Sequence, residues 1–278
     1  MRILIVGLGL IGGSLARALR GFEDCTILGV DRSEKTLAYA RAHHICDELH
    51  LDAAPLLSDA DLTILALYPR STEAFIQTYG NQFKPGSTVT DVCGIKTAIH
   101  AASTYIPDYV NYIGGHPMAG KESSGIENSD ATLFQNAHYL LTPRAGSSEH
   151  ALGLLRRMAT HLGCRDAVVT TPEEHDALIA YTSQVMHVMA VAVCDDPSLF
   201  DCRGFEGGSF RDCTRVAALD VPLWTELFSM NAPALIAAIQ NLEDNLKSYR
   251  QVLEQNDAPA LQAKLQYSSD RKRRMSLE

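Results

Sequence analysis

The chain lacks the features that mark disulfide-stapled, zinc-binding or membrane-embedded proteins. Its seven cysteines are an odd number, lie scattered along the sequence and include no CxxC pair. The sequence therefore predicts neither a disulfide framework nor a metal site. No stretch approaches the roughly 18 consecutive apolar residues of a membrane helix, and the apolar run at 3–6 is too short for a signal peptide. We expect a reduced, cytoplasmic protein with no membrane partner.

Basic residues are too few for a protein whose main partner is a nucleic acid. Lysine and arginine number 24 against 33 aspartates and glutamates, which gives a formal net charge of −9 at pH 7. The basic run at 271–274 is explained more economically as a solvated helix end than as a binding patch. With 278 residues, 46% of them hydrophobic, the chain can form a sizeable core, and its length favours two domains.

The first part of the chain alternates short apolar runs with helical patterns. Strands are predicted at 2–6, 26–30, 62–67, 87–92 and 109–113. Helices are predicted at 10–20, 34–43 and 95–102, and Ser33 is a candidate N-cap. Alternation of this kind predicts an α/β domain with a parallel sheet and crossover helices.

The pattern changes near Thr171-Pro172, after which long helices replace the strands, at 173–194, 233–255 and 258–268. Proline suits the first turn of a helix, so we place a domain boundary there. Residues 1–171 would form a dinucleotide-binding Rossmann domain and residues 172–278 an all-helical substrate and dimerisation domain. The helix at 173–194 is too apolar all round for a surface helix, which favours a homodimer.

A glycine motif follows the first strand and opens the first helix. Its residues match G-x-G-x-x-G and are candidates for cofactor binding: Gly7, Leu8, Gly9, Leu10, Ile11 and Gly12. Asp31 ends the second strand about twenty residues later, where a carboxylate binds the ribose hydroxyls and repels a 2′-phosphate. This favours NAD over NADP, although Arg32 could pair with a phosphate. Leu67 and Cys93, at or beyond strand ends, are further cofactor-binding candidates.

Four more segments carry polar side chains beyond the nucleotide motif. They are TDVCGIK at 90–96, GGHPMAGKESSG at 114–125, SQVMH at 183–187 and GGSFRDCTR at 207–215. In this order, after a Rossmann motif, they resemble the prephenate and arogenate dehydrogenase family over most of the chain. The resemblance implies a Rossmann domain followed by a helical domain that dimerises. It also implies NAD-dependent oxidative decarboxylation of prephenate to 4-hydroxyphenylpyruvate in tyrosine biosynthesis, with arogenate as the alternative substrate.

The resemblance also assigns roles to particular residues. His116 would draw the proton from the reacting hydroxyl, and Arg215 would grip a substrate carboxylate. Ser183 and His187 would line the substrate pocket, with His187 and Arg215 counted among the catalytic residues. Because prephenate is a dianion and the protein is acidic, the pocket should be locally basic, and Lys121 is a further substrate-binding candidate.

Several alternatives remain open at this stage. Gly94 stands where many family members have a serine that assists the histidine, so a backbone N–H, a water or another side chain must orient His116. His175-Asp176 is interpreted as a capping or orienting pair, and Arg215 could instead form an interface ion pair. Another two-domain Rossmann reductase and a nucleotide-sensing protein without catalysis are the rival functions. We expect no mutase domain and no regulatory domain.

Overall fold

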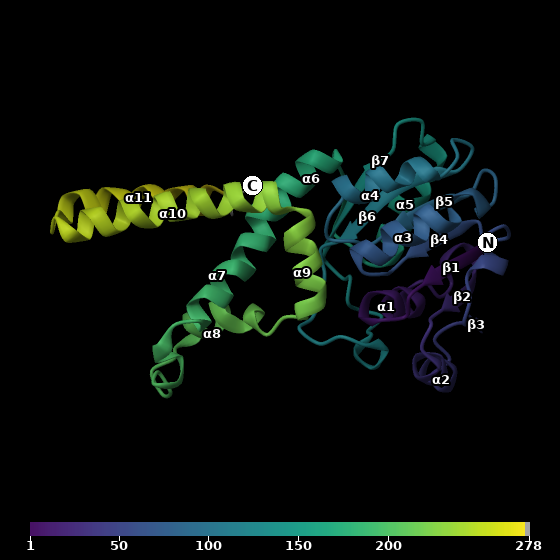
Figure 1. The fold of residues 1–278 in the computed structure, drawn as a ribbon, viewed down its shortest axis with the longest axis horizontal. Helices are drawn as coiled ribbons and strands as arrows, with labels where there is room; N and C mark the ends of the chain where they lie inside the picture. Colours follow the sequence, from purple (N-terminus) through teal and green to yellow (C-terminus); the bar gives the residue numbers. More distant parts are fainter. Residues whose placement is uncertain (276–278) are drawn as a thin grey trace. The chain divides into compact units, whose positions relative to one another are not determined.

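The computed structural model describes residues 1–275 and divides into two compact units, Met1–Ala232 and Pro233–Glu278. The first unit contains one eight-stranded sheet in the order β3-β2-β1-β4-β5-β6-β7-β8 (Figure 1). The strands are β1 Arg2–Val6, β2 Thr26–Val30, β3 Glu48–His50, β4 Leu62–Leu65, β5 Thr88–Asp91, β6 Asn111–Pro117, β7 His138–Pro143 and β8 Asp166–Val169. The pairs from β3 across to β6 are parallel, which confirms the predicted Rossmann-type sheet.

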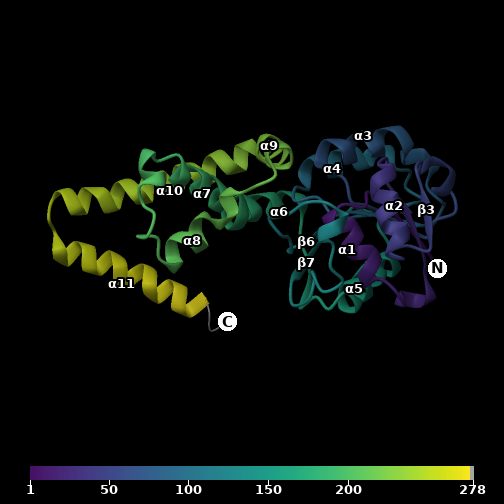
Figure 2. The same ribbon diagram turned by 90° about the horizontal axis from the view of Figure 1, so that it is seen from below.

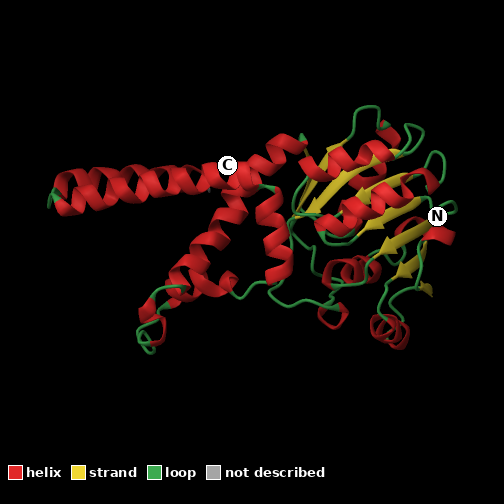
Figure 3. Ribbon diagram, in the orientation of Figure 1, coloured by secondary structure: helices red, strands yellow, loops and turns green. Residues whose placement is uncertain are grey.

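Helices cover both faces of the sheet (Figure 3). They are α1 Leu10–Ala18, α2 Glu34–Ala42, α3 Pro69–Tyr79, α4 Thr97–Ala102 and α5 Glu149–His161. Apolar residues of α1, α2 and α5 share one core cluster, and those of α3 and α4 share a second cluster on the other face. Ser33 caps α2 as predicted, since its side chain accepts from the Thr36 backbone N at 3.2 Å.

Strand β6 differs from its prediction in a way that matters for the site. The strand was expected to end at 113, but it continues through His116 to Pro117 because it pairs antiparallel with β7. Gly114 and Gly115 lie inside this strand, where neighbouring atoms leave no room for a side chain. A Cβ on Gly114 would lie 2.4 Å from Thr142 Oγ1, and a Cβ on Gly115 would lie 2.6 Å from the Asp91 carbonyl oxygen. His116 is therefore held by a strand and not by a loop after one.

The helices that follow also belong to the first unit. They are α6 Pro172–Ile179, α7 Val185–Cys194, α8 Gly208–Thr214 and α9 Val221–Met230. The predicted single helix at 173–194 is interrupted by a π-helical turn at Ala180–Gln184. Pro172–Cys194 is long and apolar enough to cross a membrane by length and composition alone, a test that core helices of soluble proteins also pass.

The second unit is a helical hairpin of α10 Ala232–Glu254 and α11 Ala258–Met275 (Figure 2). Its two helices contact through the Tyr249 and Ser268 hydroxyls, 3.2 Å apart. The ammonium of Lys264 lies 5.2 Å from the centroid of the Tyr249 ring, within the range of a cation–π interaction. Helices at both predicted positions are thus confirmed, and α11 runs further than expected.

A buried ion pair lies at the end of β5. The Lys96 ammonium contacts the Asp91 carboxylate, and both side chains are fully buried. Asp91 also accepts from the Tyr112 hydroxyl at 2.7 Å and from the Cys93 backbone N at 2.8 Å. A buried charge is tolerated when its partners satisfy it, so Asp91 keeps Lys96 in the interior beside the carboxyl ends of the strands.

Removing the buried cation should strongly destabilise the first unit. We expect Lys96→Met to lower the free energy of unfolding by about 3–5 kcal/mol, because it leaves the Asp91 carboxylate buried without its counter-ion. Lys84→Met is the matched control, since Lys84 pairs with Asp61 at 2.6 Å on the surface and should change stability little. Urea denaturation followed by circular dichroism measures both; equal shifts would contradict this account.

Candidate active site

The glycine loop between β1 and α1 leaves room for a ligand. Gly7 has φ +94, and a Cβ on Gly12 would lie 1.8 Å from the Gly7 carbonyl oxygen, so the turn requires glycine at both positions. A Cβ on Gly9, in contrast, would meet no heavy atom of the described residues within 4 Å. Open space beside Gly9 and the first-turn N–H groups of α1 fits the approach of a pyrophosphate.

A cavity of about 650 Å³ extends from this loop toward the helices. Its lining comes from the glycine loop, the ends of β4 and β5, the segment after β6, the π-helical turn and the region around α9. Among the predicted site residues, those that line it are Gly9, Leu10, Ile11, Cys93, His116, Lys121, Ser183, His187 and Arg215. The structure thus brings the nucleotide loop and most of the predicted substrate residues to one cavity.

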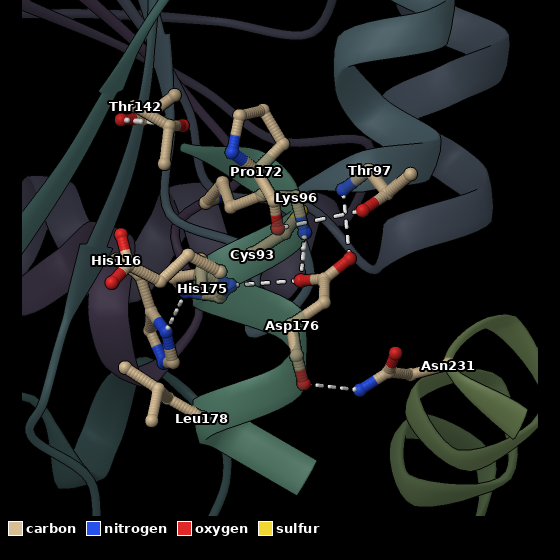
Figure 4. Close-up of polar contacts among 12 residues, drawn as sticks. Cys93, Lys96, Thr97, His116, Thr142, Pro172, His175, Asp176, Leu178 and Asn231 are labelled. Atoms are coloured by element: carbon tan, nitrogen blue, oxygen red, sulfur yellow. Dashed lines mark hydrogen bonds and ion pairs between the residues drawn. The ribbon is translucent and has the colours of Figure 1, made fainter. Parts of the chain in front are cut away.

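His116 is connected to two residues of α6 (Figure 4). Its Nδ1 lies 2.9 Å from His175 Nε2, and His175 Nδ1 lies 2.8 Å from Asp176 Oδ1. The Asp176 carboxylate also accepts from the backbone N–H groups of Lys96 at 2.7 Å and Thr97 at 2.8 Å. The sequence left three candidates for the group that orients His116: a backbone N–H, a water or another side chain. In the structure the partner is another side chain, that of His175.

Both histidines of this row are biased toward the neutral form. Burial lowers the pKa of His116 well below its usual value, and the nearby His175 and Lys96 lower it further while Asp176 opposes them. Burial also lowers the pKa of His175, although the hydrogen bond that His175 donates to Asp176 opposes this shift. Burial would raise the pKa of Asp176, but its donors His175, Thr97 and Lys96 outweigh burial and lower it. At neutral pH the row therefore comprises two imidazoles and a carboxylate.

The π-helical turn positions the second predicted histidine. Ser183 lies in this turn, and its carbonyl accepts from His187 Nδ1 at 3.0 Å. The His187 ring stacks on Trp224 of α9 with centroids 3.6 Å apart, and burial lowers the pKa of His187. Gln184 and Asn231 hydrogen-bond at 2.8 Å, which joins the turn to the end of α9. His187 thus presents a neutral, fixed ring to the cavity.

The two predicted cations of the site are paired with carboxylates. Arg215 contacts Glu122, which follows β6 and also lines the cavity. Lys121 lies 3.2 Å from Asp130, whose pKa falls to about 2 through hydrogen bonds from Thr132 and Lys121. An ion pair for Arg215, which the sequence left open as an alternative, is present, and the Arg215 side chain remains more than half exposed.

Asp31 and Leu67 contact the nucleotide loop, and the Cys93 thiol contacts the Leu67 carbonyl. Asp31 Oδ2 accepts from the Leu8 backbone N at 2.9 Å, and Oδ1 accepts from Ser33 N at 2.8 Å. Leu67 would touch a Cβ placed on Gly7, at 3.0 Å, and therefore supports the turn. Burial and Asp91 raise the pKa of the Cys93 thiol to about 12, so this thiol is not a nucleophile at neutral pH. Asp31, Leu67 and Arg32 are not among the cavity-lining residues.

Sequence reasoning missed three residues of the site. Glu122 stands in the motif that was singled out, but its pairing with Arg215 is a contact across 93 positions that no local pattern reveals. Trp224 lies nine residues beyond the GGSFRDCTR motif at 207–215 and was assigned no role, and it stacks on His187. Asn231, in contrast, had no signal in the sequence. The HD pair at 175–176 was a usable signal for the row that ends at His116.

The chain combines a Rossmann sheet with a glycine loop that opens into a cavity lined by histidines. These features define a nucleotide-binding enzyme with helices after the sheet. The chain belongs to the prephenate dehydrogenase family. It matches the family's nucleotide-binding domain over residues 15–169 and its dimerization domain over residues 171–267. The predicted family is thereby confirmed, and the chain is a dehydrogenase of this oxidoreductase family.

Individual relatives agree with this assignment. The chain is 30% identical to a cyclohexadienyl dehydrogenase of Zymomonas mobilis, over 93% of this chain and 90% of that protein. The prephenate dehydrogenase of A. aeolicus in complex with hydroxyphenyl propionate and NAD+ has a TM-score of 0.88 at 27% identity, covering 100% of this chain and 98% of that one. Synechocystis arogenate dehydrogenase has a TM-score of 0.81 at 30% identity, covering 99% and 100%.

Two glycine substitutions should distinguish a glycine needed for nucleotide binding from a glycine needed for folding. Gly9→Ala should leave the melting temperature nearly unchanged but weaken nucleotide binding by roughly tenfold, about 1.4 kcal/mol, because its methyl enters the open space beside the loop. Gly12→Ala should destabilise the fold by about 1–3 kcal/mol, because its methyl overlaps the Gly7 carbonyl. Thermal denaturation and nucleotide titration calorimetry test the pair; a Gly9→Ala protein with normal affinity would contradict the assignment of this space.

Proposed function

We propose that the chain catalyses the NAD-dependent oxidative decarboxylation of prephenate to 4-hydroxyphenylpyruvate, a step of tyrosine biosynthesis. The observation that carries the proposal is a neutral imidazole, His116, lining the same cavity as the open glycine loop. A neutral imidazole can accept the proton of an alcohol, and the glycine loop suits a dinucleotide. The names of the relatives support prephenate as the substrate.

The cofactor would be held by the glycine loop and by Asp31. Gly9 and the first turn of α1 would receive the pyrophosphate, and Asp31 would bind the ribose hydroxyls, which favours NAD over NADP. The A. aeolicus relative was solved with NAD+. When bound, NAD+ supplies the acceptor for the electron pair and hydrogen that leave the ring carbon bearing the hydroxyl.

The protein's own residues would handle the proton and the charges of the substrate. His116 Nε2 would take the proton of the reacting hydroxyl, which makes loss of electrons from that carbon easier. Arg215 would hold a substrate carboxylate in a bidentate fork, replacing its contact with Glu122. His187 and Ser183 would contact the substrate from the π-helical turn, with Lys121 nearby, and the apolar lining would limit water around the reacting ring.

Arogenate is the second candidate substrate, since one of the similar structures is an arogenate dehydrogenase. Arogenate carries an amino group in place of the side-chain keto group, at the end of the molecule remote from the reacting hydroxyl. The role of His116 would be the same with either substrate. Parallel assays with both compounds decide the preference.

The domain assignment and the assembly are also part of the proposal. We place the boundary between the nucleotide-binding and helical parts at Pro172, beside the junction of the two family matches. Residues 171–267 match a dimerization domain, and Leu178, Met186 and Val193 expose apolar surface, which supports a homodimer. Light scattering that gives the mass of a single chain at micromolar concentration would exclude it. We infer a cytoplasmic enzyme.

The test of the function is NADH formation from NAD+ and prephenate, followed at 340 nm as an ordinary absorbance assay at about 25 °C. His116→Asn should lower kcat by roughly 10²–10⁴-fold with nucleotide affinity little changed, because it removes the base but keeps a polar side chain. Since the pKa of His116 is lowered, the neutral base persists as pH falls through about 6.5, and kcat should decline only below that pH. Normal kcat in His116→Asn would refute His116 as the acceptor.

Arg215 should act mainly on substrate affinity. Arg215→Ala should raise KM for prephenate by roughly 10-fold or more, about 1.4 kcal/mol, while kcat falls less and nucleotide affinity stays the same. Arg211→Ala is the matched control, since it lies on α8 in the same motif and is not among the cavity-lining residues. If Arg215→Ala loses thermal stability but keeps its KM, the Glu122 pair is structural.

A further inference from the structure

The row of His116, His175 and Asp176 determines which ring nitrogens carry hydrogen (Figure 4). A carboxylate only accepts hydrogen bonds, so His175 Nδ1, 2.8 Å from Asp176 Oδ1, must carry its hydrogen. A neutral imidazole has one N–H, so His175 Nε2 is an acceptor. The nitrogen 2.9 Å away, His116 Nδ1, is then the donor. His116 Nε2 is left with a free lone pair.

Hydrogen bonds from three neighbouring residues hold Asp176 in place. Its two oxygens accept from the Lys96 and Thr97 backbone N–H groups, and the Asp176 backbone carbonyl accepts from Asn231 Nδ2 at 2.9 Å. The His175 side chain is fully buried and that of Asp176 is 8% exposed. The carboxylate therefore cannot rotate away from His175 without giving up backbone hydrogen bonds in the interior.

The charged groups that face the row come from three places. Asp176 lies on α6, Asp91 ends β5, and Lys96 lies in the segment between β5 and α4. Lys96 and Asp91 form an ion pair of their own, which leaves Asp176 as the carboxylate bonded to the row. The second histidine is thus kept neutral with its Nδ1 hydrogen directed at Asp176.

Position 94 contributes no side chain to His116. A Cβ there would lie 3.7 Å from His116 Nε2, but the residue is glycine. Within residues 1–275, the hydrogen bond to His175 is the one that the His116 ring makes. Orientation of the ring therefore depends on His175.

We propose that His175 and Asp176 are positioning residues that fix His116 in the tautomer whose Nε2 accepts the substrate proton. This inference rests on the proposed function for its catalytic meaning, while the tautomer itself is a property of the free protein. Once His116 is protonated, its Nδ1–H still donates to His175, and the Asp176 carboxylate beyond it stabilises the added positive charge. The arrangement needs no movement of the ring during the reaction.

The decisive variant is Asp176→Ala, because it removes the carboxylate that accepts from His175 Nδ1. Without that acceptor neither tautomer of His175 is imposed, and His116 Nδ1 is no longer required to be the donor. We expect ¹⁵N NMR of the imidazoles to show His116 unprotonated at Nε2 in the parent protein and a mixture of both tautomers in the variant. We also expect kcat with prephenate to fall by roughly 10-fold or more with KM little changed. Glu173→Gln, which removes one exposed carboxylate from the same turn of α6, should alter neither the tautomer nor kcat.

A second pair of variants serves if Asp176→Ala fails to fold. His175→Gln can still accept from His116 Nδ1 through its amide oxygen, whereas His175→Leu cannot. We expect His175→Gln to keep at least tenfold more kcat than His175→Leu. Equal kcat in the two, or an unchanged His116 tautomer in Asp176→Ala, would overturn the proposal. If the parent protein does not oxidise prephenate, the proposed function fails, and the NMR comparison still decides the positioning role.

Discussion

The buried Lys96 connects the sheet to the helices that complete the cavity. Its ammonium contacts Asp91 at the end of β5, and its backbone N–H binds Asp176 on α6. One residue therefore joins a strand end of the nucleotide-binding sheet to the first helix after it. Because the charges are fully buried, separating these elements would expose an unpaired charge to an apolar interior, which is costly. The relative placement of His116 and His175 depends on this connection.

Strand β6 supplies the second constraint on the position of His116, because this residue lies within the strand. Antiparallel pairing with β7 sets His116 opposite Leu140, and the glycines before it allow the strand to pass close to Thr142 and Asp91. A larger residue at 114 would clash with Thr142 of β7, and one at 115 would clash with Asp91 of β5, so either would displace the strand and the imidazole with it. A histidine held in a paired strand keeps its direction better than one on a loop, which suits a base that must meet a substrate at hydrogen-bond distance.

The sequence predicted those parts of the fold that local patterns specify. Residues 2–12 combine an apolar run, a glycine motif and a helical pattern, and β1, the loop and α1 form there. Strands β3, β7 and β8 were not predicted. β3 has only three residues, and β7 and β8 extend the sheet beyond β6 through pairing with neighbours that no local pattern reveals. Similarly, Gly114-Gly115 is a local strand breaker that tertiary packing overrides. The π-helical turn at Ala180–Gln184 has no signature in a run of good helix formers.

The same division applies to the site. Motif matching found His116, His187 and Arg215, and all three line one cavity, but it could not reveal their partners. Glu122 neutralises Arg215 and Asp130 neutralises Lys121, so the cations of an acidic protein are compensated before any substrate binds. A substrate carboxylate at Arg215 would exchange one carboxylate for another, and the guanidinium would never stand unpaired. Affinity then depends on the difference between two ion pairs and not on the full strength of one, and the freed Glu122 must turn to solvent, which its partial exposure permits.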